Sequence, residues 1–292
     1  MSEHNGMGWI PDYPDIRDYT DEHKQVKDVF STAKSKKSAV APAAGPVVDL
    51  RSWCSPIENQ LNLGSCTANA GVGMYEYFER RAFGTHSNAS RLFLYKVTRN
   101  LLGWTGDTGA FLRTTMGALV LFGTPPEKYW PYIVADFDKE PTAFCYAYAQ
   151  NYQAIQYYRL DPPGTTPVAF LNTIKNYLNA GYVSIIGFTV YNSYTQAAIT
   201  GKIPFPVAND KTVGGHAIAI VGYDDDMKIK NTNPGGAETT GAFIIRNSWG
   251  TGWGQSGYGY LPYEYVLKEQ AMDCWSMIKG EWVLSGQFGI PV

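Results

Sequence analysis

One cysteine of the sequence stands where it could act as a nucleophile. Cys66 follows Gly64 and Ser65 and opens a stretch in which apolar residues recur at helical spacing. A thiol in the first turn of a helix lies at the positive end of the helix dipole, which favours the reactive thiolate. The Cys66 amide N–H and the side chain of Gln60 could hold the oxyanion that its attack creates. Taken alone, a cysteine in an apolar helix is more often structural.

A histidine and an asparagine further along the chain could complete this chemistry. His216 follows two glycines and begins an apolar run typical of a strand, so it could serve as a general base facing a cleft. Asn247 ends another such run beside Trp249 and could orient an imidazole, with the indole keeping water away. Each motif alone has an ordinary interpretation, as a core histidine or a glycine-rich turn. All three in this order indicate a catalytic set.

Together the motifs resemble those of the papain-like cysteine proteases. Gln60 precedes Cys66 by six residues, the spacing of the family's oxyanion glutamine. Residues 247–258 read Asn-Ser-Trp-Gly-Thr-Gly-Trp-Gly-Gln-Ser-Gly-Tyr and match the family's asparagine motif almost completely. The stretch 48–51 (Val-Asp-Leu-Arg) resembles the start of the mature domain, and 129–132 (Tyr-Trp-Pro-Tyr) a landmark of the helical lobe. The resemblance covers residues 46–275.

The resemblance implies an α+β fold with a helical left lobe, a β-barrel-like right lobe and an active-site cleft between them. It implies an endopeptidase that hydrolyses peptide bonds through a thioester acyl-enzyme, without a cofactor and without a metal. Cys66 would then attack the carbonyl, with Gln60 supporting the oxyanion. His216 would move the proton, and Asn247 would fix the tautomer of its imidazole.

Substrate contacts also follow from the resemblance. The expected contact residues are Gly109, Ala110, Phe111, Ile186, Val213, Gly214, Gly215, Trp249 and Trp253. The pocket for the second residue before the scissile bond would be lined by Phe111, Ile186, Val213 and Gly214. Because this lining is apolar and carries no charge, it predicts a hydrophobic or aromatic side chain in the pocket.

The chain departs from the family pattern at several positions. Thr67 stands where the family usually has an aromatic residue, and Ala110 replaces the second glycine of a substrate-binding pair. Leu63 replaces a cysteine that is normally in a disulfide, so the usual bridges of the helical lobe are expected to be missing. The long spacing between the histidine and asparagine motifs predicts an inserted loop at 224–241. Its acidic residues are expected to be solvated and not to bind a metal.

Local patterns predict the elements that position these residues. The predicted helices run over 66–84, from Ser90, up to Gly123 and over 166–181, and the predicted strands over 182–190, 216–223, 242–249 and 258–265. The chain divides into an N-terminal extension (1–45), a helical lobe with the nucleophile (46–155) and a β-rich lobe with the histidine and asparagine (156–292). The extension ends in an Ala/Pro-rich linker. Either it lies in the cleft as an inhibitory pro-segment or it packs permanently on the surface.

Composition limits the other classes of function. The net charge of 24 − 26 = −2 gives no basic surface for nucleic acid or an anionic membrane. No apolar run approaches the ~18 residues of a membrane span, and the first twenty residues lack a signal-peptide pattern. We therefore expect a monomer that is cytoplasmic or exported by a non-standard route. The expected partners are peptide or protein substrates and proteinaceous cysteine-protease inhibitors.

Two other functions would use the same residues. A catalytically silent relative that only binds peptides would keep the fold, although the intact catalytic set argues against it. An acyltransferase or deamidase would apply the same thiolate chemistry to another acceptor, and the motifs do not distinguish it from a hydrolase. A nucleotide-binding enzyme is disfavoured because the sequence has no G-x-G-x-x-G and no P-loop. Whether Cys54, Cys145 and Cys274 form a disulfide is left open.

Overall fold

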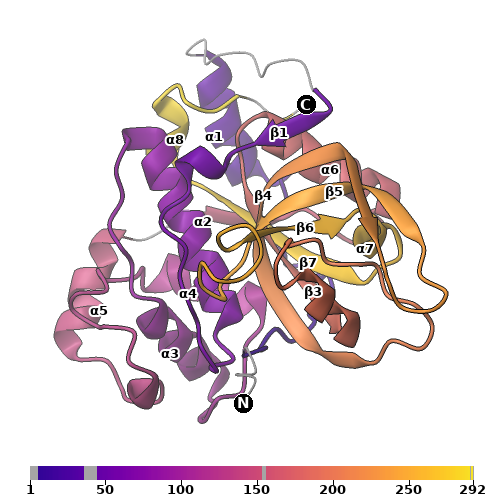
Figure 1. Cartoon of the computed structure of the whole chain (residues 1–292). Coiled ribbons are helices and arrows are strands. Elements are labelled where there is room, and N and C mark those ends of the chain that lie inside the picture. Colours follow the sequence, from indigo (N-terminus) through magenta and orange to yellow (C-terminus); the bar gives the residue numbers. More distant parts are fainter. Residues whose placement is uncertain (1–5, 36–44, 153–155, 290, 292) are drawn as a thin grey trace.

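The chain folds into a group of helices beside a twisted antiparallel sheet (Figure 1). The computed structural model describes residues 6–35, 45–152, 156–289 and 291. The helices are α1 (Lys24–Ser35), α2 (Cys66–Phe83), α3 (Arg91–Leu102), α4 (Leu112–Leu121), α5 (Ala143–Ala149), α6 (Pro167–Asn179), α7 (Glu264–Leu267) and α8 (Gly280–Leu284). The strands are β1 (Val47–Asp49), β2 (Gln156–Arg159), β3 (Ser184–Tyr191), β4 (Thr212–Lys230), β5 (Glu238–Arg246), β6 (Tyr258–Pro262) and β7 (Ala271–Ile278).

The helix that carries the cysteine is buried along most of its length. The first thirteen residues of α2 are all buried, and the helix ends at Gly84, whose φ of 75° is a left-handed conformation that glycine adopts without steric cost. Ser90 caps α3 by accepting a hydrogen bond from the Phe93 N–H, and Thr166 caps α6 in the same way. Because these ends depend on local residues, the sequence predicted them well.

The sheet places the histidine and asparagine motifs on neighbouring strands. The strand order is β2-β7-β3-β4-β5-β6, with β1 added on β4. His216 lies on β4 opposite Phe188 of β3, and Asn247 follows the end of β5 directly. The described strands form an open path from β2 to β6, so the barrel-like right lobe is in fact an open, β-rich antiparallel sheet.

Two local predictions in this sheet were wrong. Residues 224–230 and 238–241 are not a loop, because β4 and β5 continue through them as a paired hairpin. Asp224, Asp225 and Asp226 follow one another there and none is buried, and Asp225 pairs with Lys175 at 2.7 Å. The strand expected over 258–265 stops at Pro262, and Tyr265 lies in the short helix α7.

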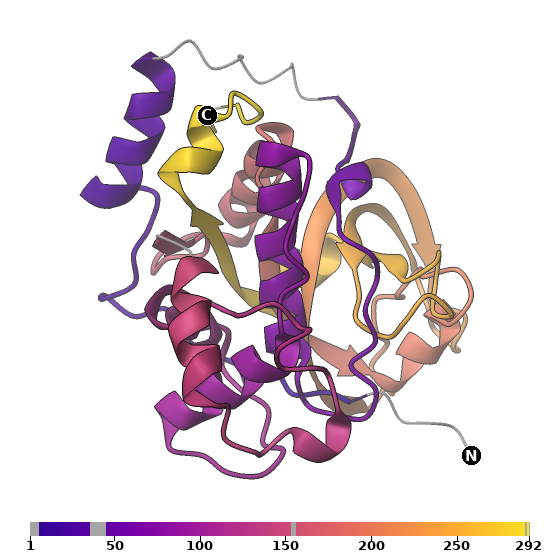
Figure 2. The same cartoon turned by 90° about the vertical axis from the view of Figure 1, so that its left-hand side faces the viewer.

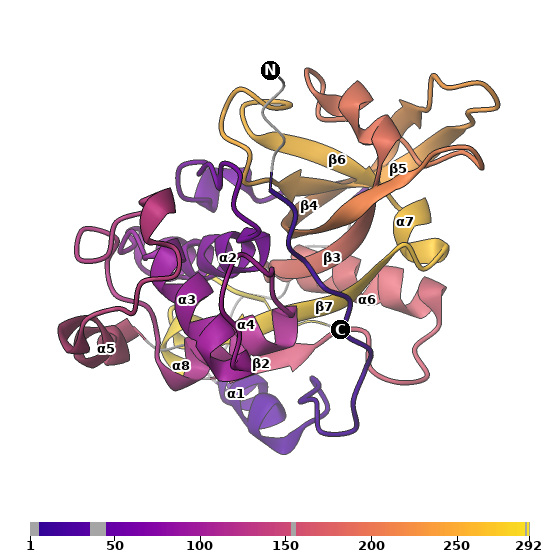
Figure 3. The same cartoon turned by 90° about the horizontal axis from the view of Figure 1, so that it is seen from below.

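The N-terminal residues belong to the core of the molecule. Val26 and Phe30 of α1 are buried, and the Phe30 ring packs edge-on against Tyr158, Tyr177 and Tyr182. Figure 2 shows α1 beside α8 and α6, and Figure 3 shows the preceding residues running between the helices and the sheet. The predicted linker at 39–46 falls largely outside the described residues. No helix in the described part of the chain has the length and apolar character that a membrane crossing needs.

Candidate active site

Cys66 is the first residue of α2 and is fully buried. Backbone N–H groups of Ala217, Gly8 and Thr67 point at its sulfur, so the thiol lies beside the residue that follows His216. These donors favour the thiolate, but the loss of solvent outweighs them and raises the pKa of Cys66 to about 11. In the full chain the thiol is therefore protonated at neutral pH.

His216 and Asn247 form a direct hydrogen bond. The distance from His216 Nε2 to Asn247 Oδ1 is 2.8 Å, and the same oxygen accepts the Ser248 N–H at 2.8 Å. An amide oxygen only accepts, so Nε2 carries the proton and Nδ1 keeps its lone pair. Nδ1 is buried without a hydrogen-bond partner among the described residues, and burial lowers the pKa of His216 to about 4.

Trp249 covers the imidazole of His216, and Trp253 packs against Trp249. The Trp249 ring stacks on His216 with the centroids 4.5 Å apart and an interplanar angle of 25°, and Trp253 packs edge-on against Trp249 at 5.4 Å. Both indoles are nearly buried, at 5% and 7% exposure. The indoles keep water away from the hydrogen bond between His216 and Asn247. Neither partner can therefore exchange it for a hydrogen bond to solvent.

Gln60 is held so that its amide nitrogen can donate into the cleft. Its Oε1 accepts the Ser248 hydroxyl at 2.5 Å, and its backbone carbonyl accepts the Tyr132 hydroxyl at 2.9 Å. The amide Nε2 donates to Leu63 O at 2.8 Å and to the carbonyl of Gly6 at 2.9 Å. The carbonyl of the chain's own Gly6 thus occupies the donor that an oxyanion would need.

Residues 6–10, which we call the plug, run through this cleft (Figure 3). Ala110 N donates to Gly8 O at 2.8 Å, and Ile10 N donates to Ala110 O at 3.2 Å. Trp9 N donates to Gly215 O at 3.1 Å on the opposite wall. A Cβ on Gly8 would lie 1.8 Å from Gly64 O, so the plug approaches the nucleophile loop as closely as only glycine allows.

The Trp9 side chain fills a pocket beside the thiol. A Cβ on Gly187 would lie 1.9 Å from its ring, and Gly215 also lies against it. The indole Nε1 donates to Asp273 Oδ2 at 3.0 Å, and Trp9 is 5% exposed. Asp273 is a buried carboxyl whose pKa burial raises to about 7. The pocket therefore fits a flat aromatic ring and has one hydrogen-bond acceptor, Asp273, at its end.

The plug runs in the opposite direction to the expected substrate. In a substrate, the pocket residue would precede the carbonyl that reaches Gln60. In the plug, the Gly6 carbonyl comes first and Trp9 follows, and Trp9 pairs with Ala110 in parallel. The plug also presents an N–H, that of Gly8, to the sulfur of Cys66. A chain in this position faces the thiol with a backbone N–H and does not present a carbonyl in the order of a substrate.

The structure brings most of the predicted site residues together. Gly109, Ala110, Gly214 and Gly215 contact the plug. The Phe111 ring packs at a tilt against Trp104, Ile186 is buried in β3, and Val213 is 48% exposed at the start of β4. Sequence analysis did not single out Trp9, Gly187, Ser248 or Asp273. All four cysteines are free, and no group of residues suited to a metal occurs in the described ranges.

The buried thiol leads to a prediction about chemical modification. Between pH 5 and 10, Cys66 and His216 are both uncharged in the full chain, because the two pKa values lie outside this range. Alkylation by iodoacetamide should therefore be slow at pH 7 and rise about tenfold per pH unit, since the thiolate is the reacting form. Peptide mapping by mass spectrometry separates Cys66 from the other cysteines. Fast alkylation that is independent of pH between 6 and 8 would show an ion pair and contradict the prediction.

Comparison with known proteins agrees with this geometry. Residues 45–273 match the model of the family described as papain family cysteine protease. An uncharacterised peptidase C1-like protein of Acanthamoeba polyphaga mimivirus is 32% identical over 279 residues, which cover 92% of this chain and 85% of that protein. The crystal structure of xylellain, a cysteine protease from Xylella fastidiosa, is 33% identical, with a TM-score of 0.73 and coverage of 94% of this chain and 96% of that chain.

A more distant structure shows the same fold. Digestive procathepsin L 3 from the larval midgut of Tenebrio molitor is 18% identical, with a TM-score of 0.61 and coverage of 90% and 83% of the two chains. The family match spans more than half of the chain and contains the cysteine, histidine and asparagine described above. On this evidence the chain is a cysteine peptidase that belongs to the papain family.

Proposed function

We propose that the chain is an endopeptidase that its own N-terminal residues hold inactive. One observation carries the proposal: the plug uses the Gln60 donor, the backbone of Ala110 and the pocket of Trp9 at the same time. These are the contacts that a substrate needs. The plug continues past the pocket to Asp12 and Tyr13, so the cleft accommodates a continuous chain, as an endopeptidase requires.

The chemistry begins once the plug has left and water reaches the pair. His216 Nδ1 takes the thiol proton of Cys66, and the thiolate forms a bond to the carbonyl carbon, whose π electrons move to the oxygen. The Gln60 amide and the Cys66 N–H stabilise this oxyanion. When the intermediate collapses, His216 gives its proton to the leaving amine. Water, deprotonated by the same imidazole, then releases the acid from the thioester. Asn247 keeps the ring in the required orientation throughout.

The emptied pocket favours an aromatic side chain with a hydrogen-bond donor. Trp9 shows that an indole fits between Gly187 and Gly215 with its N–H on Asp273. A substrate side chain without a donor would leave the buried Asp273 carboxylate with one hydrogen bond fewer, which costs binding free energy. At the second residue before the scissile bond, the pocket therefore selects tryptophan over negatively charged residues.

A single substitution in the plug tests the proposal. In Gly8→Val the new side chain would collide with Gly64 O, so the plug should leave the cleft. We expect hydrolysis of a fluorogenic peptide, with Trp as the second residue before the bond, to rise at least tenfold over the full chain. The peptide with Asp at that position should stay a poor substrate. Gly280→Val is the matched control, because a Cβ there meets open space.

The outcomes separate the alternatives. Trp9→Ala is the second opening variant, in case Gly8→Val is poorly folded by circular dichroism. Equal rates for the unaltered chain and both variants would refute inhibition by the plug. If the folded variants hydrolyse no peptide, the endopeptidase proposal fails, and acyl transfer to an added amine or simple peptide binding becomes the better explanation.

A further inference from the structure

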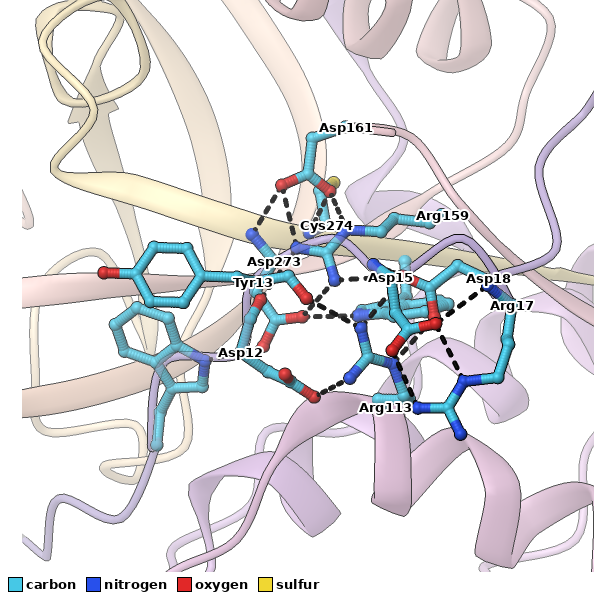
Figure 4. A network of polar contacts seen from close by, with 12 residues as sticks. Asp12, Tyr13, Asp15, Arg17, Asp18, Arg113, Arg159, Asp161, Asp273 and Cys274 are labelled. Carbon is cyan, nitrogen blue, oxygen red and sulfur yellow. Dashed lines mark hydrogen bonds and ion pairs between the residues drawn. The ribbon is translucent and has the colours of Figure 1, made fainter. Parts of the chain in front are cut away.

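Beyond the Trp9 pocket, the plug is followed by residues 12–18, which bind two arginines, the partly buried Arg113 and the fully buried Arg159 (Figure 4). Arg113 Nε donates to Asp18 Oδ1 at 2.7 Å and its Nη2 to Asp18 Oδ2 at 2.9 Å. Its Nη1 donates to Asp12, and its Nη2 also donates to Tyr13 O at 2.8 Å. Arg159 Nη1 lies 3.4 Å from the same Asp18 carboxylate. Two guanidinium groups thus meet on one carboxylate whose side chain is 4% exposed.

The two arginines differ in the carboxylate partners that they keep when residues 12–18 leave the site. Arg159 keeps Asp161, at 2.9 Å, and Asp273, at 3.4 Å, both from the body of the protein. In contrast, every hydrogen-bond partner of Arg113 in the described part of the chain belongs to residues 12–18. Opening the cleft therefore leaves one guanidinium without an anion.

The remaining carboxylates do not take the place of Asp12 and Asp18. Asp161 already accepts the backbone N–H groups of Asp273 and Cys274, at 2.8 and 3.0 Å, besides Arg159. Asp273 accepts the indole N–H of Trp275 at 2.7 Å. The guanidinium groups also keep a fixed neighbour, because both lie over the Trp275 ring, at 5.8 and 5.1 Å from its centroid. The emptied site is thus preorganised for a carboxylate.

We infer that Arg113, with Arg159 beside it, is a carboxylate-binding subsite for acidic peptide substrates, and that Asp12 and Asp18 fill it in the full chain. The inference rests on the proposed function. Arg113 comes three residues after Ala110, the edge on which the plug pairs, and Arg159 contacts the Asp273 that ends the Trp9 pocket. A substrate with its second residue before the bond in that pocket brings its third to fifth residues toward this site.

The experiment uses the full chain with three substitutions that empty the site, which we call the vacated chain. Gly8→Val displaces the plug, and Asp12→Asn with Asp18→Asn removes the chain's own carboxylates while keeping their shape. Paired peptides carry Asp or Asn at the third, fourth or fifth residue before the scissile bond and Trp as the second. We expect the Asp peptide of one pair to have roughly tenfold higher kcat/KM, since a charge-assisted bidentate contact contributes that much.

Five comparisons assign the preference to Arg113. Arg113→Gln in the vacated chain should bring the Asp/Asn ratio to about one, and Arg113→Lys should restore part of it. Arg17→Gln should leave the ratio unchanged, because Arg17 is an exposed arginine whose ion-pair partner among the described residues is Asp15. In the chain with Gly8→Val only, the ratio should be smaller, since Asp12 and Asp18 still compete. Added salt should lower the ratio by weakening the Asp peptide alone.

The possible failures are distinguishable. If the vacated chain hydrolyses Asp and Asn peptides equally at all three positions, the subsite is refuted while the peptidase stands. If a preference survives Arg113→Gln, its origin lies elsewhere and the inference is likewise refuted. If neither the vacated chain nor the same chain carrying Trp9→Ala hydrolyses any of the peptides, the proposed function fails, and the inference fails with it.

Discussion

Cys66→Ala in the chain opened by Gly8→Val should lower kcat by roughly 10⁶-fold, the loss measured when a catalytic nucleophile is removed from a triad enzyme. The reason is structural, because the Cys66 sulfur receives the backbone N–H of Ala217, the residue after His216. Cys145 illustrates the contrast, since its sulfur lies 3.7 Å from Tyr129 O in the helical part of the molecule. The rate of release of a fluorogenic amine, followed under reducing conditions, measures the effect.

The matched control is Cys145→Ala, which removes an equally buried thiol and should leave turnover within about twofold. Circular dichroism and the thermal midpoint show whether Cys66→Ala is folded, and a methyl in place of the thiol leaves little empty volume. Substantial turnover in folded Cys66→Ala would place the nucleophile on another residue and overturn the mechanism. Retained binding of the peptide, measured by fluorescence, would confirm that only the chemical step has been lost.

The arrangement of the candidate catalytic residues could be predicted from the sequence because short motifs fix their positions. The Gly-Ser-Cys turn places the thiol at the start of α2, and the two glycines before His216 lie near the start of β4, the strand that carries the histidine. Trp249 and Trp253 follow Asn247 closely enough to cover the imidazole from the same turn. In each case the chain within a few residues determines the geometry.

The position of the N-terminal residues could not be predicted in this way. Their place in the cleft depends on contacts such as Gln60 with Gly6 and Trp9 with Asp273, which are 54 and 264 residues apart. A Gly-x-Gly-Trp run, in which both glycines approach the backbone at 63–64, was the available signal. In the structure the plug lies against the Cys66 loop while α1 packs into the core, and inhibition by the extension stays a prediction.

Asp273 was missed for a different reason. It stands in an apolar strand, where a carboxylate usually points to solvent, and alternation along a strand predicts only which face a residue occupies. In the structure it is fully buried because Arg159 and Trp9 supply donors from two distant segments, and Trp275 supplies a third from the same strand. Its φ of 62° is rare for a residue with a side chain, so the surrounding contacts must hold it there.

Two parts of the N-terminal segment are held by contacts of different strength. Residues 6–18 bury one large apolar side chain, Trp9, and otherwise rely on polar contacts at the edge of the cleft, whereas α1 buries Val26 and Phe30 among aromatic side chains. Polar contacts that solvent can replace contribute less than apolar burial of this kind. The plug should therefore open while α1 stays in place, and the full chain with plug substitutions is the right form in which to measure activity.

Gln60→Ala should affect the two states of the chain in opposite ways. In the chain opened by Gly8→Val, it removes a donor to the oxyanion and should lower kcat by about 10²–10³-fold with little change in KM. In the chain with an intact plug, the same substitution removes the hydrogen bond that holds Gly6 O. Alkylation of Cys66 at pH 7 should then become faster, although the enzyme has become less active.

Gln60→Glu is the informative companion to this variant. It keeps an oxygen for the Ser248 hydroxyl but replaces the donating NH₂ by an acceptor, so it should lose as much turnover as Gln60→Ala. A purely structural role would give a different pattern, because the isosteric glutamate would then retain most of the activity. Since one amide serves both the plug and the oxyanion, faster alkylation together with slower turnover would show that the plug inhibits by occupying the catalytic donor itself.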